Sequence, residues 1–227
     1  MESEADVWIV IPVYNEETVI GGVVAEVLAA FPNVVCVDDG SRDRSAQSIA
    51  ESGAHLVRHP VNLGQGAALQ TGVTYALQQG AEYIVTFDAD GQHRVEDAQT
   101  MIVVARAGDA DVVLGSRFLN GNDQVPLLKR IVLRVVVALS RNARRLRLSD
   151  AHNGLRVFNR VAAEKLNITI NGMAHASEIV GFLAASGLRV REVPVTILYT
   201  EYSLSKGQSL VNGVNILFDL SVRQRGV

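Results

Sequence analysis

The sequence predicts an α/β fold in which a mostly parallel central sheet is covered by helices on both faces. Two observations lead to this prediction. Over the first 115 residues, short apolar runs rich in β-branched residues alternate with longer segments of helical period. Such alternation is typical of parallel sheets that are buried on both sides. The chain has 227 residues, 48% of them hydrophobic, and no internal repeat or low-complexity linker, so we expect one domain.

Each expected strand is a short run dominated by apolar, mostly β-branched residues. In the first half of the chain the expected strands are residues 7–13, 33–39, 54–59, 82–88 and 111–116. The segments between them show apolar residues at three-to-four spacing, which predicts helices. These helices are expected at 17–31, 43–52, 65–79 and 95–107. The second half is less regular, with strands expected at 153–159 and 188–197 and helices at 174–186 and 209–222.

Composition narrows the classes of function. A net charge of −3 gives no general attraction to nucleic acid. The single cysteine, Cys36, cannot form an internal disulfide and lies in an apolar run, where we expect it to be buried. The acidic N-terminus lacks a signal-peptide pattern, and no apolar run approaches the roughly 20 residues that cross a bilayer. We therefore expect a cytoplasmic protein that is at most peripheral on the inner face of the cell membrane.

Two Asp-Ala-Asp triplets occur in the chain, and their positions relative to the strands differ. Asp88 and Asp90 follow directly after an expected strand, whereas Asp109 and Asp111 precede one. Ligands of open α/β sheets bind beyond the carboxyl ends of the strands. We therefore favour a functional role for the first triplet over an acidic turn, and expect the second to solvate a turn at the opposite edge.

The ends of four expected strands bring further polar residues to the same edge of the sheet. A carboxylate-rich rim is costly through like-charge repulsion unless a cation or a hydrogen-bonding ligand shares it. Carboxylates of this kind suit Mg²⁺ or Mn²⁺ shared with substrate phosphates, and an arginine supplies a permanent cation for phosphate. The alternative for one of these motifs, DDGS, is a simple turn and helix cap. The residues concerned are Pro12, Tyr14, Asn15, Glu16, Asp38, Asp39, Gly40, Ser41, Asp88, Asp90, Gly115, Ser116 and Arg117.

A glycine-containing segment, NLGQGAALQTG at 62–72, invites comparison with dinucleotide-binding loops. It fails that test because Leu69 stands where the third glycine should be and because it follows the third strand. Gly64 and Gly66 then either let the backbone pass close to a ligand or begin a helix.

A basic segment, residues 126–147, contains no acidic residue. Arg130, Arg134, Arg141 and Arg145 share one face of the expected helix, and apolar side chains occupy another. A basic amphipathic helix is typical of a surface that binds anionic lipid. The alternatives are a solvated helix packed on the sheet or a nucleic-acid patch, and the lack of aromatic residues in the segment disfavours the latter.

Taken together, IPVYNEE, VDDGS, NLGQGAA, FDADGQH and GSRF resemble the motifs of family 2 glycosyltransferases with the GT-A, Rossmann-like fold. Further along, DAHNGLRVFNR and EVPVTILYTEYSLSKGQS resemble the branch that loads sugars onto polyprenyl phosphates, the dolichyl-phosphate mannose synthase type. Within that branch the chain resembles the short actinobacterial enzymes, polyprenyl-phospho-N-acetylgalactosaminyl synthases among them. The resemblance implies one domain, with residues 1–120 as the nucleotide-sugar half and 121–227 as the acceptor and membrane-facing half.

The resemblance also implies roles for individual residues. The nucleoside would lie against Pro12, Tyr14, Glu16 and Asp39, and the divalent ion that bridges the diphosphate would be held by Asp88, Asp90 and Gln92. The expected catalytic residues are Asp90, Arg117 and Lys206, while Asp38, Gly66 and Ser205 complete the expected cofactor-binding set. Arg117, Ser205 and Lys206 would face phosphate of the donor or the acceptor. One departure is Gln65, where many relatives carry lysine.

The chemistry can be reasoned from the groups involved. A metal and Arg117 can neutralise the departing diphosphate while the anomeric carbon develops oxocarbenium-like charge. A lipid phosphate is already anionic, so it needs no general base. The base candidates His175 and Glu178 lie in a helical pattern where a structural role is the alternative. We therefore expect inverting transfer from a nucleotide sugar, preferably UDP-N-acetylgalactosamine or another UDP-hexose, to polyprenyl phosphate.

Three other functions compete with this one. The first is a GDP-mannose-dependent synthase of the same branch. The second is a sugar nucleotidyltransferase, which would need a loop rich in glycine and lysine where this chain has YNEE. The third is a non-catalytic module that binds a nucleotide or a lipid. The replacement of the lysine of many relatives by Gln65 is compatible with this function. A membrane-anchoring partner protein is a further expectation, because the sequence shows no anchor.

Overall fold

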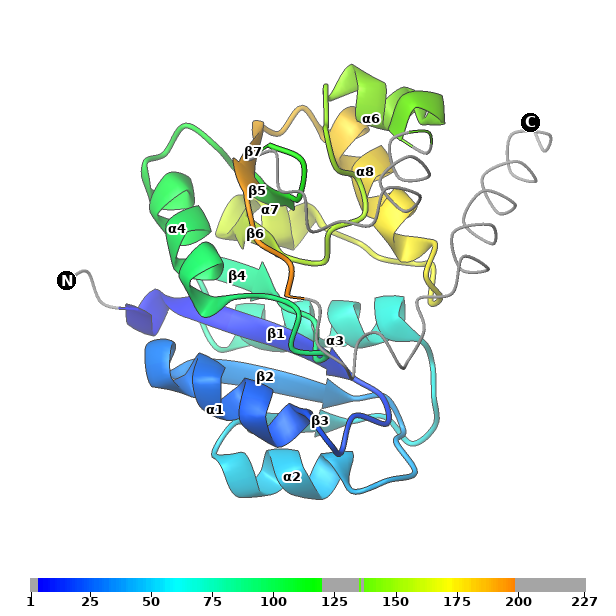
Figure 1. Ribbon diagram of the computed structural model, residues 1–227. Helices are drawn as coiled ribbons and strands as arrows, with labels where there is room; N and C mark the ends of the chain where they lie inside the picture. The colour runs from blue at the N-terminus through cyan, green and yellow to red at the C-terminus, as the bar shows by residue number, and fades with distance from the viewer. Residues whose placement is uncertain (1–3, 120–134, 136, 199–227) are drawn as a thin grey trace.

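A seven-stranded sheet forms the centre of the computed structural model, which describes residues 4–119, 135 and 137–198 (Figure 1). The strand order is β3-β2-β1-β4-β6-β5-β7. The strands are β1 (Val7–Val13), β2 (Asn33–Asp38), β3 (His55–Arg58), β4 (Tyr83–Thr86), β5 (Val112–Ser116), β6 (Arg156–Asn159) and β7 (Val190–Pro194). Every strand expected from the sequence is present, and the single α/β domain with a mostly parallel sheet is confirmed.

β6 is the antiparallel member of the sheet, paired with β4 on one side and β5 on the other. The remaining pairings are parallel. Because β6 runs the opposite way, its first residue, Arg156, lies opposite Thr86 near the carboxyl end of β4. The chain segment that leads into β6 therefore reaches the edge of the sheet where the parallel strands end.

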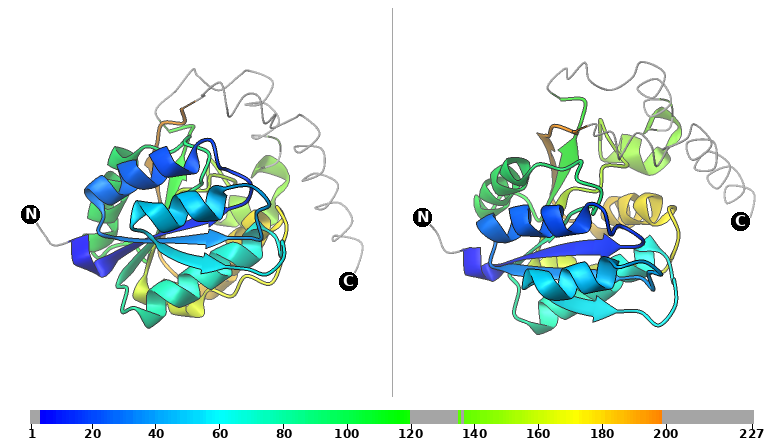
Figure 2. Two further views of the ribbon diagram at one scale, coloured as in Figure 1. Left: turned by 90° about the horizontal axis from the view of Figure 1, so that it is seen from below. Right: turned by 60° about the horizontal axis from the view of Figure 1, so that its bottom comes forward.

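Helices cover both faces of the sheet, as Figures 1 and 2 show. One face carries α1 (Ile20–Ala30), α2 (Ser45–Ser52) and α4 (Val95–Arg106), whose apolar residues join one buried cluster. The other carries α3 (Gln65–Gln78), α6 (Arg141–Arg145), α7 (Arg160–Lys165) and α8 (His175–Ser186), which join a second cluster. A short 3-10 helix, Glu4–Asp6, precedes β1.

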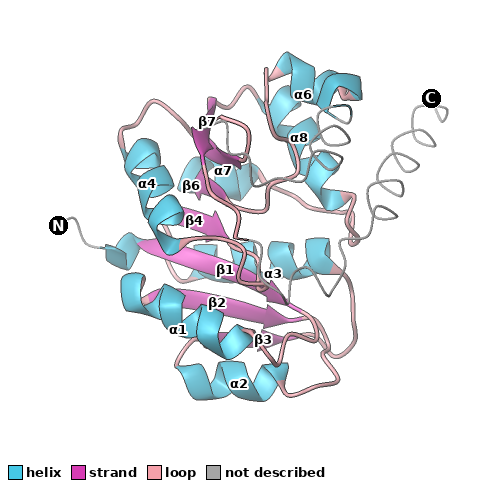
Figure 3. Cartoon of the chain, in the orientation of Figure 1, coloured by secondary structure: helices cyan, strands magenta, loops and turns pink. Residues whose placement is uncertain are grey.

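The helix boundaries follow local signals in the sequence. Figure 3 separates the helices from the loops that join them. In α1 the buried residues Ile20, Val23, Val24 and Val27 recur at the expected three-to-four spacing. α2 ends at Gly53, whose φ of 89° is a left-handed conformation that glycine adopts at little cost. α7 was not expected from the sequence; the Asn159 side chain caps it by accepting the Ala162 N–H.

The second acidic triplet lies at the opposite edge of the sheet, as its place before β5 predicts. We expected its aspartates only to solvate a turn, but both also form ion pairs. Asp111 forms a bidentate pair with Arg189, with an Nη2–Oδ1 distance of 2.7 Å, and also accepts from the Asn159 amide at 3.1 Å. Asp109 pairs with Arg191 at 2.8 Å. These contacts tie together β5, β6 and β7.

Only part of the basic segment lies within the described residues. Arg141 and Arg145 belong to α6 and are exposed, while Ala143 between them is buried. Arg130 and Arg134, the helix expected at 209–222, and the site residues Ser205 and Lys206 lie outside the described residues. Within the described part of the chain, no helix is long and apolar enough to cross a membrane.

The burial of Cys36 gives a test of the fold. Its side chain in β2 is fully buried, and burial raises the pKa of the thiol to about 12. Because the thiolate is the reactive form, Cys36 should resist Ellman's reagent in the native protein and react at once in denaturant. Rapid stoichiometric reaction without denaturant would contradict the buried position of β2.

Candidate active site

The loops after β1 and β2 are joined into one unit by hydrogen bonds. Ser41 Oγ accepts from the Asn15 N–H at 2.9 Å, and Ser45 Oγ accepts from the Glu16 N–H at 2.8 Å. Asn15 Oδ1 in turn accepts from the Arg42 N–H at 2.9 Å. Asn15 has a left-handed φ of 54°, which asparagine tolerates better than most residues. The YNEE and DDGS motifs are therefore held side by side, as their positions after adjacent strands predict.

Asp38 and Asp39 anchor the chain around them. Asp38 is fully buried, accepts from the Ser41 N–H at 3.1 Å and pairs with Arg58 Nε at 3.0 Å. Asp39 Oδ1 contacts His59 Nδ1 at 2.7 Å and accepts the Leu63 N–H, while Oδ2 accepts the Gly64 N–H at 2.7 Å. The Asp39 carboxylate, which we expect to contact the nucleoside, therefore also holds the loop after β3 in place.

A cavity of about 560 Å³ opens between these loops, within the usual size range of ligand sites. Its walls include the aromatic rings of Tyr14 and His59 and the cationic side chains of Arg42 and Arg58. Of the expected nucleoside-site residues, Tyr14 lines this cavity, whereas Pro12 lies within β1. Glu16 lies in the loop after β1, and its negative charge contributes to the raised pKa of Asp90. The lining residues are Tyr14, Gly40, Ser41, Arg42, Arg58, His59, Pro60, Val61 and Asn62.

Gly66 lies in the first turn of α3, so the expectation that the glycine segment begins a helix is confirmed. The Gly66 N–H donates to Asn171 O at 2.8 Å. A Cβ atom at Gly66 would lie only 2.0 Å from Ile170 O. The absence of a side chain at Gly66 is therefore explained by close packing against residues 170–171, and its expected contact with a cofactor stays a prediction.

The first acidic triplet presents two carboxylates with different electrostatics. Burial alone would raise the pKa of Asp88, but a 3.0 Å hydrogen bond from His93 Nε2 and the positive charge of Arg156 lower it below its usual value. The pKa of Asp90 is raised to about 6 by burial and by the negative charge of Asp88, against a hydrogen bond from the Gln92 N–H. The protein therefore stabilises the negative charge of Asp88 more than that of Asp90.

This donor set fits a hard divalent ion. Asp88 and Asp90 offer carboxylate oxygens, and the buried side chain of Gln92 lies two residues beyond. Among the described residues no group of three or more His, Cys, Asp or Glu side chains is arranged to hold a metal. Mg²⁺ and Mn²⁺ are commonly bound by one or two carboxylates together with water and substrate phosphates, so two carboxylates suffice. Gln92 as a third ligand stays a prediction.

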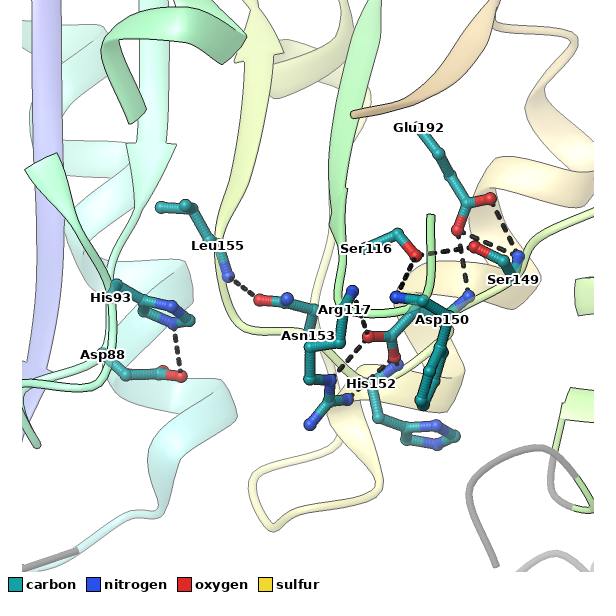
Figure 4. A network of polar contacts seen from close by, with 11 residues as sticks. Asp88, His93, Ser116, Arg117, Ser149, Asp150, His152, Asn153, Leu155 and Glu192 are labelled. Atoms are coloured by element: carbon teal, nitrogen blue, oxygen red, sulfur yellow. Dashed lines mark hydrogen bonds and ion pairs between the residues drawn. The ribbon is translucent and has the colours of Figure 1, made fainter. Parts of the chain in front are cut away.

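Arg117, expected to face phosphate, is oriented by an acid that sequence reasoning did not single out. The guanidinium forms a bidentate pair with Asp150, at 2.6 Å for Nε–Oδ2 and 2.8 Å for Nη2–Oδ1, and both side chains are buried (Figure 4). Burial would raise the pKa of Asp150, but the charge and hydrogen bonds of Arg117 hold it below its usual value. Glu192 on β7 holds the backbone at this point by accepting the Ser149 and Asp150 N–H groups.

Two further residues near Asp88 were not predicted: sequence reasoning did not single out Arg156 and gave no role to His93. Arg156 is 3% exposed and lies opposite both Thr86 and Leu114 in the sheet. Its position as a lone cation in the strand LRVF was the available signal, since a charged residue between buried neighbours needs a partner. His93 is buried, and Figure 4 shows its ring pointing at Asp88.

The two base candidates have structural partners. Glu178 accepts from the Thr169 and Ile170 N–H groups, at 3.1 and 2.9 Å, and so fixes the segment before α8. His175 is 4% exposed, and its Nδ1 lies 2.9 Å from Gly172 O. Burial and the charge of Arg156 lower the pKa of His175, which favours the neutral form of its ring. These contacts favour the structural interpretation of both residues.

The paired carboxylates lie at the carboxyl edge of a mostly parallel α/β sheet, the edge where open sheets of this kind bind ligands. The model of glycosyl transferase family 2 matches residues 8–166, and the chain belongs to this family. The chain is 28% identical to the UDP-N-acetylglucosamine–dolichyl-phosphate N-acetylglucosaminyltransferase of Methanococcus voltae, over 97% of this chain and 96% of that protein.

Two further proteins resemble this chain, one in sequence and one in structure. The polyprenol monophosphomannose synthase of Mycolicibacterium smegmatis is 28% identical over 92% of this chain and 82% of its own length. The crystal structure of glucosyl-3-phosphoglycerate synthase from Mycobacterium tuberculosis, in complex with Mn²⁺, UDP and glucosyl-3-phosphoglycerate, matches with a TM-score of 0.68 and 17% identity. It covers 89% of this chain and 74% of that one. The structural likeness shows the expected GT-A fold.

The buried pair of Arg117 and Asp150 should be costly to break. Replacing Asp150 by Asn leaves the guanidinium without its counter-charge, so we expect a loss of about 3–5 kcal/mol in the free energy of unfolding. Asp109→Asn is the matched control, because its pair with Arg191 is more than half exposed on both sides and should contribute less than about 1 kcal/mol. Equal urea midpoints for the two variants would contradict a large contribution of the Arg117–Asp150 pair to stability.

Proposed function

We propose that this protein transfers a sugar from a nucleotide sugar to polyprenyl phosphate, with inversion at the anomeric carbon. The observation that carries the proposal is the carboxylate pair Asp88–Asp90, placed at the carboxyl edge of the sheet in a family 2 glycosyltransferase chain. The names of the two relatives, a dolichyl-phosphate N-acetylglucosaminyltransferase and a polyprenol monophosphomannose synthase, support a lipid phosphate as the acceptor.

The donor we favour is a UDP-N-acetylhexosamine. The relative from Methanococcus voltae, which aligns with nearly the whole chain, is named for UDP-N-acetylglucosamine. Our sequence-based preference for UDP-N-acetylgalactosamine falls in the same chemical class. GDP-mannose is the second candidate, supported by the mycobacterial relative named as a monophosphomannose synthase.

Each part of the site has a role in this reaction. Asp88 and Asp90, with Gln92, would hold Mg²⁺ or Mn²⁺, which supplies charge neutralisation to the diphosphate leaving group. The nucleoside would enter the cavity beside Tyr14. Arg117, oriented by Asp150, would face phosphate together with Ser205 and Lys206, which lie outside the described residues.

The bond changes require no general base. An oxygen of the lipid phosphate attacks the anomeric carbon as the bond from that carbon to the nucleoside diphosphate breaks, and the bonding electrons leave with the diphosphate. The attacking oxygen is already anionic near neutral pH. His175 and Glu178 can therefore keep the structural contacts described above.

The two halves assigned from sequence remain our proposal for the division of labour. Residues 1–120 would bind the nucleotide sugar, and 121–227 would face the acceptor and the membrane surface. The exposed arginines of α6 support contact with anionic lipid at the inner face of the cell membrane. A membrane-anchoring partner protein is part of the same proposal and is tested by co-purification from detergent extracts.

The reaction can be assayed directly. With Mn²⁺ or Mg²⁺ and a short-chain polyprenyl phosphate, we expect labelled sugar from UDP-N-acetylhexosamine to move into the lipid phase, and EDTA to abolish the transfer. UDP-glucose and GDP-mannose run in parallel identify the donor. Failure of all these donors to yield a lipid-linked sugar would sink the proposed function.

Replacing Asp90 tests the role of the acidic pair. Asp90→Ala should lower turnover by at least about 100-fold, because the metal's several kcal/mol of charge stabilisation would be lost. Asp109→Ala, a change at the exposed first aspartate of the second triplet, should retain full activity. Circular dichroism checks that both variants fold. An active Asp90→Ala enzyme would remove this carboxylate from the mechanism.

A further inference from the structure

The Asp88 carboxylate is enclosed by the chain on three sides. His93 Nε2 lies 3.0 Å from Oδ2, and Gln65 Nε2 lies 3.3 Å from Oδ1. The third side is the backbone of Gly154. A Cβ atom at Gly154 would lie 2.1 Å from Asp88 Oδ2 and 2.7 Å from Oδ1, far inside van der Waals contact. The carboxylate therefore occupies the space that a side chain at position 154 would need.

The backbone of Gly154 is fixed in this place by its neighbours. Its carbonyl oxygen accepts from Thr86 Oγ1 at 2.6 Å. Leu155 O accepts from the Gly115 N–H at 3.0 Å, and the Leu155 N–H donates to Asn153 Oδ1 at 2.9 Å. The segment is thus held between β4 and β5 on both sides, and it has little freedom to retreat from a larger residue.

Space, rather than backbone conformation, explains the glycine at this position. The φ of Gly154 lies outside the left-handed range that favours glycine, unlike that of Gly40, whose φ is +72°. An alanine could therefore adopt the backbone of residue 154 without strain, and its methyl group would meet the Asp88 carboxylate directly.

We propose that Gly154 is a positioning residue for the metal site: the space left by its missing side chain holds the Asp88 carboxylate where it can bind the divalent ion. The proposal rests on the proposed metal role of Asp88. The same short segment carries Asp150, which orients Arg117. One piece of backbone thus sets the position of a carboxylate for the metal and of a guanidinium for phosphate.

The test is the affinity of the purified full-length protein for Mn²⁺ alone, measured from the electron paramagnetic resonance signal of the free ion. Gly154→Ala should weaken Mn²⁺ binding by about 10-fold or more, the usual effect of disturbing groups that orient a ligand. Gly21→Ala is the control, because a Cβ atom at Gly21 in α1 meets nothing within 4 Å. Unchanged affinity in a folded Gly154→Ala protein would overturn the proposal.

A milder pair of variants decides the matter if Gly154→Ala does not fold. Thr86→Val removes the hydroxyl that holds the Gly154 carbonyl and should weaken Mn²⁺ binding by several-fold. Thr100→Val removes a hydroxyl contact to Glu96 O on the exposed face of α4, and should leave Mn²⁺ binding unchanged. Equal Mn²⁺ affinities for these two variants would overturn the proposal. Absence of Mn²⁺ binding by the unmodified protein would instead overturn the metal role of Asp88 on which it rests.

Discussion

The candidate site depends on the carboxylates that lie together at one edge of the sheet. The protein balances their negative charge only in part. Asp38 is paired with Arg58, and Asp150 with Arg117. Asp90 is different, since burial and the neighbouring Asp88 raise its pKa to about 6. A divalent ion that also carries a diphosphate would remove this cost, which is why the charge pattern and the proposed chemistry agree.

The antiparallel strand β6 joins the two halves of the chain at this edge. It enters the sheet between β4 and β5, so the segment before it meets the loop that carries Asp88. The buried Arg156 at the start of β6 places a positive charge near Asp88 and Asp150 together. The second half of the chain therefore contributes residues to the surroundings of Asp88, where we propose that the metal binds.

Much of the fold and part of the site could be predicted from the sequence. Short apolar runs located every strand in the described part of the chain. The position of each acidic triplet, after or before a strand, separated Asp88 and Asp90 from Asp109 and Asp111. The partners of these residues could not be predicted in the same way. Contacts such as Arg117 with Asp150, or Asp88 with Gly154, join segments far apart in the chain, and periodicity carries no information about them. The six residues of α7 are likewise too few to show a clear helical repeat.

We propose that Asp88 and Asp90 together bind the metal of a nucleotide-sugar site. Anomalous X-ray scattering from Mn²⁺ in crystals grown with UDP tests it most directly. We expect a single strong peak roughly 2 Å from carboxylate oxygens of both residues, beside the nucleotide diphosphate. A crystal with UDP bound and its manganese ligated elsewhere, with neither carboxylate in contact with the ion, would contradict it.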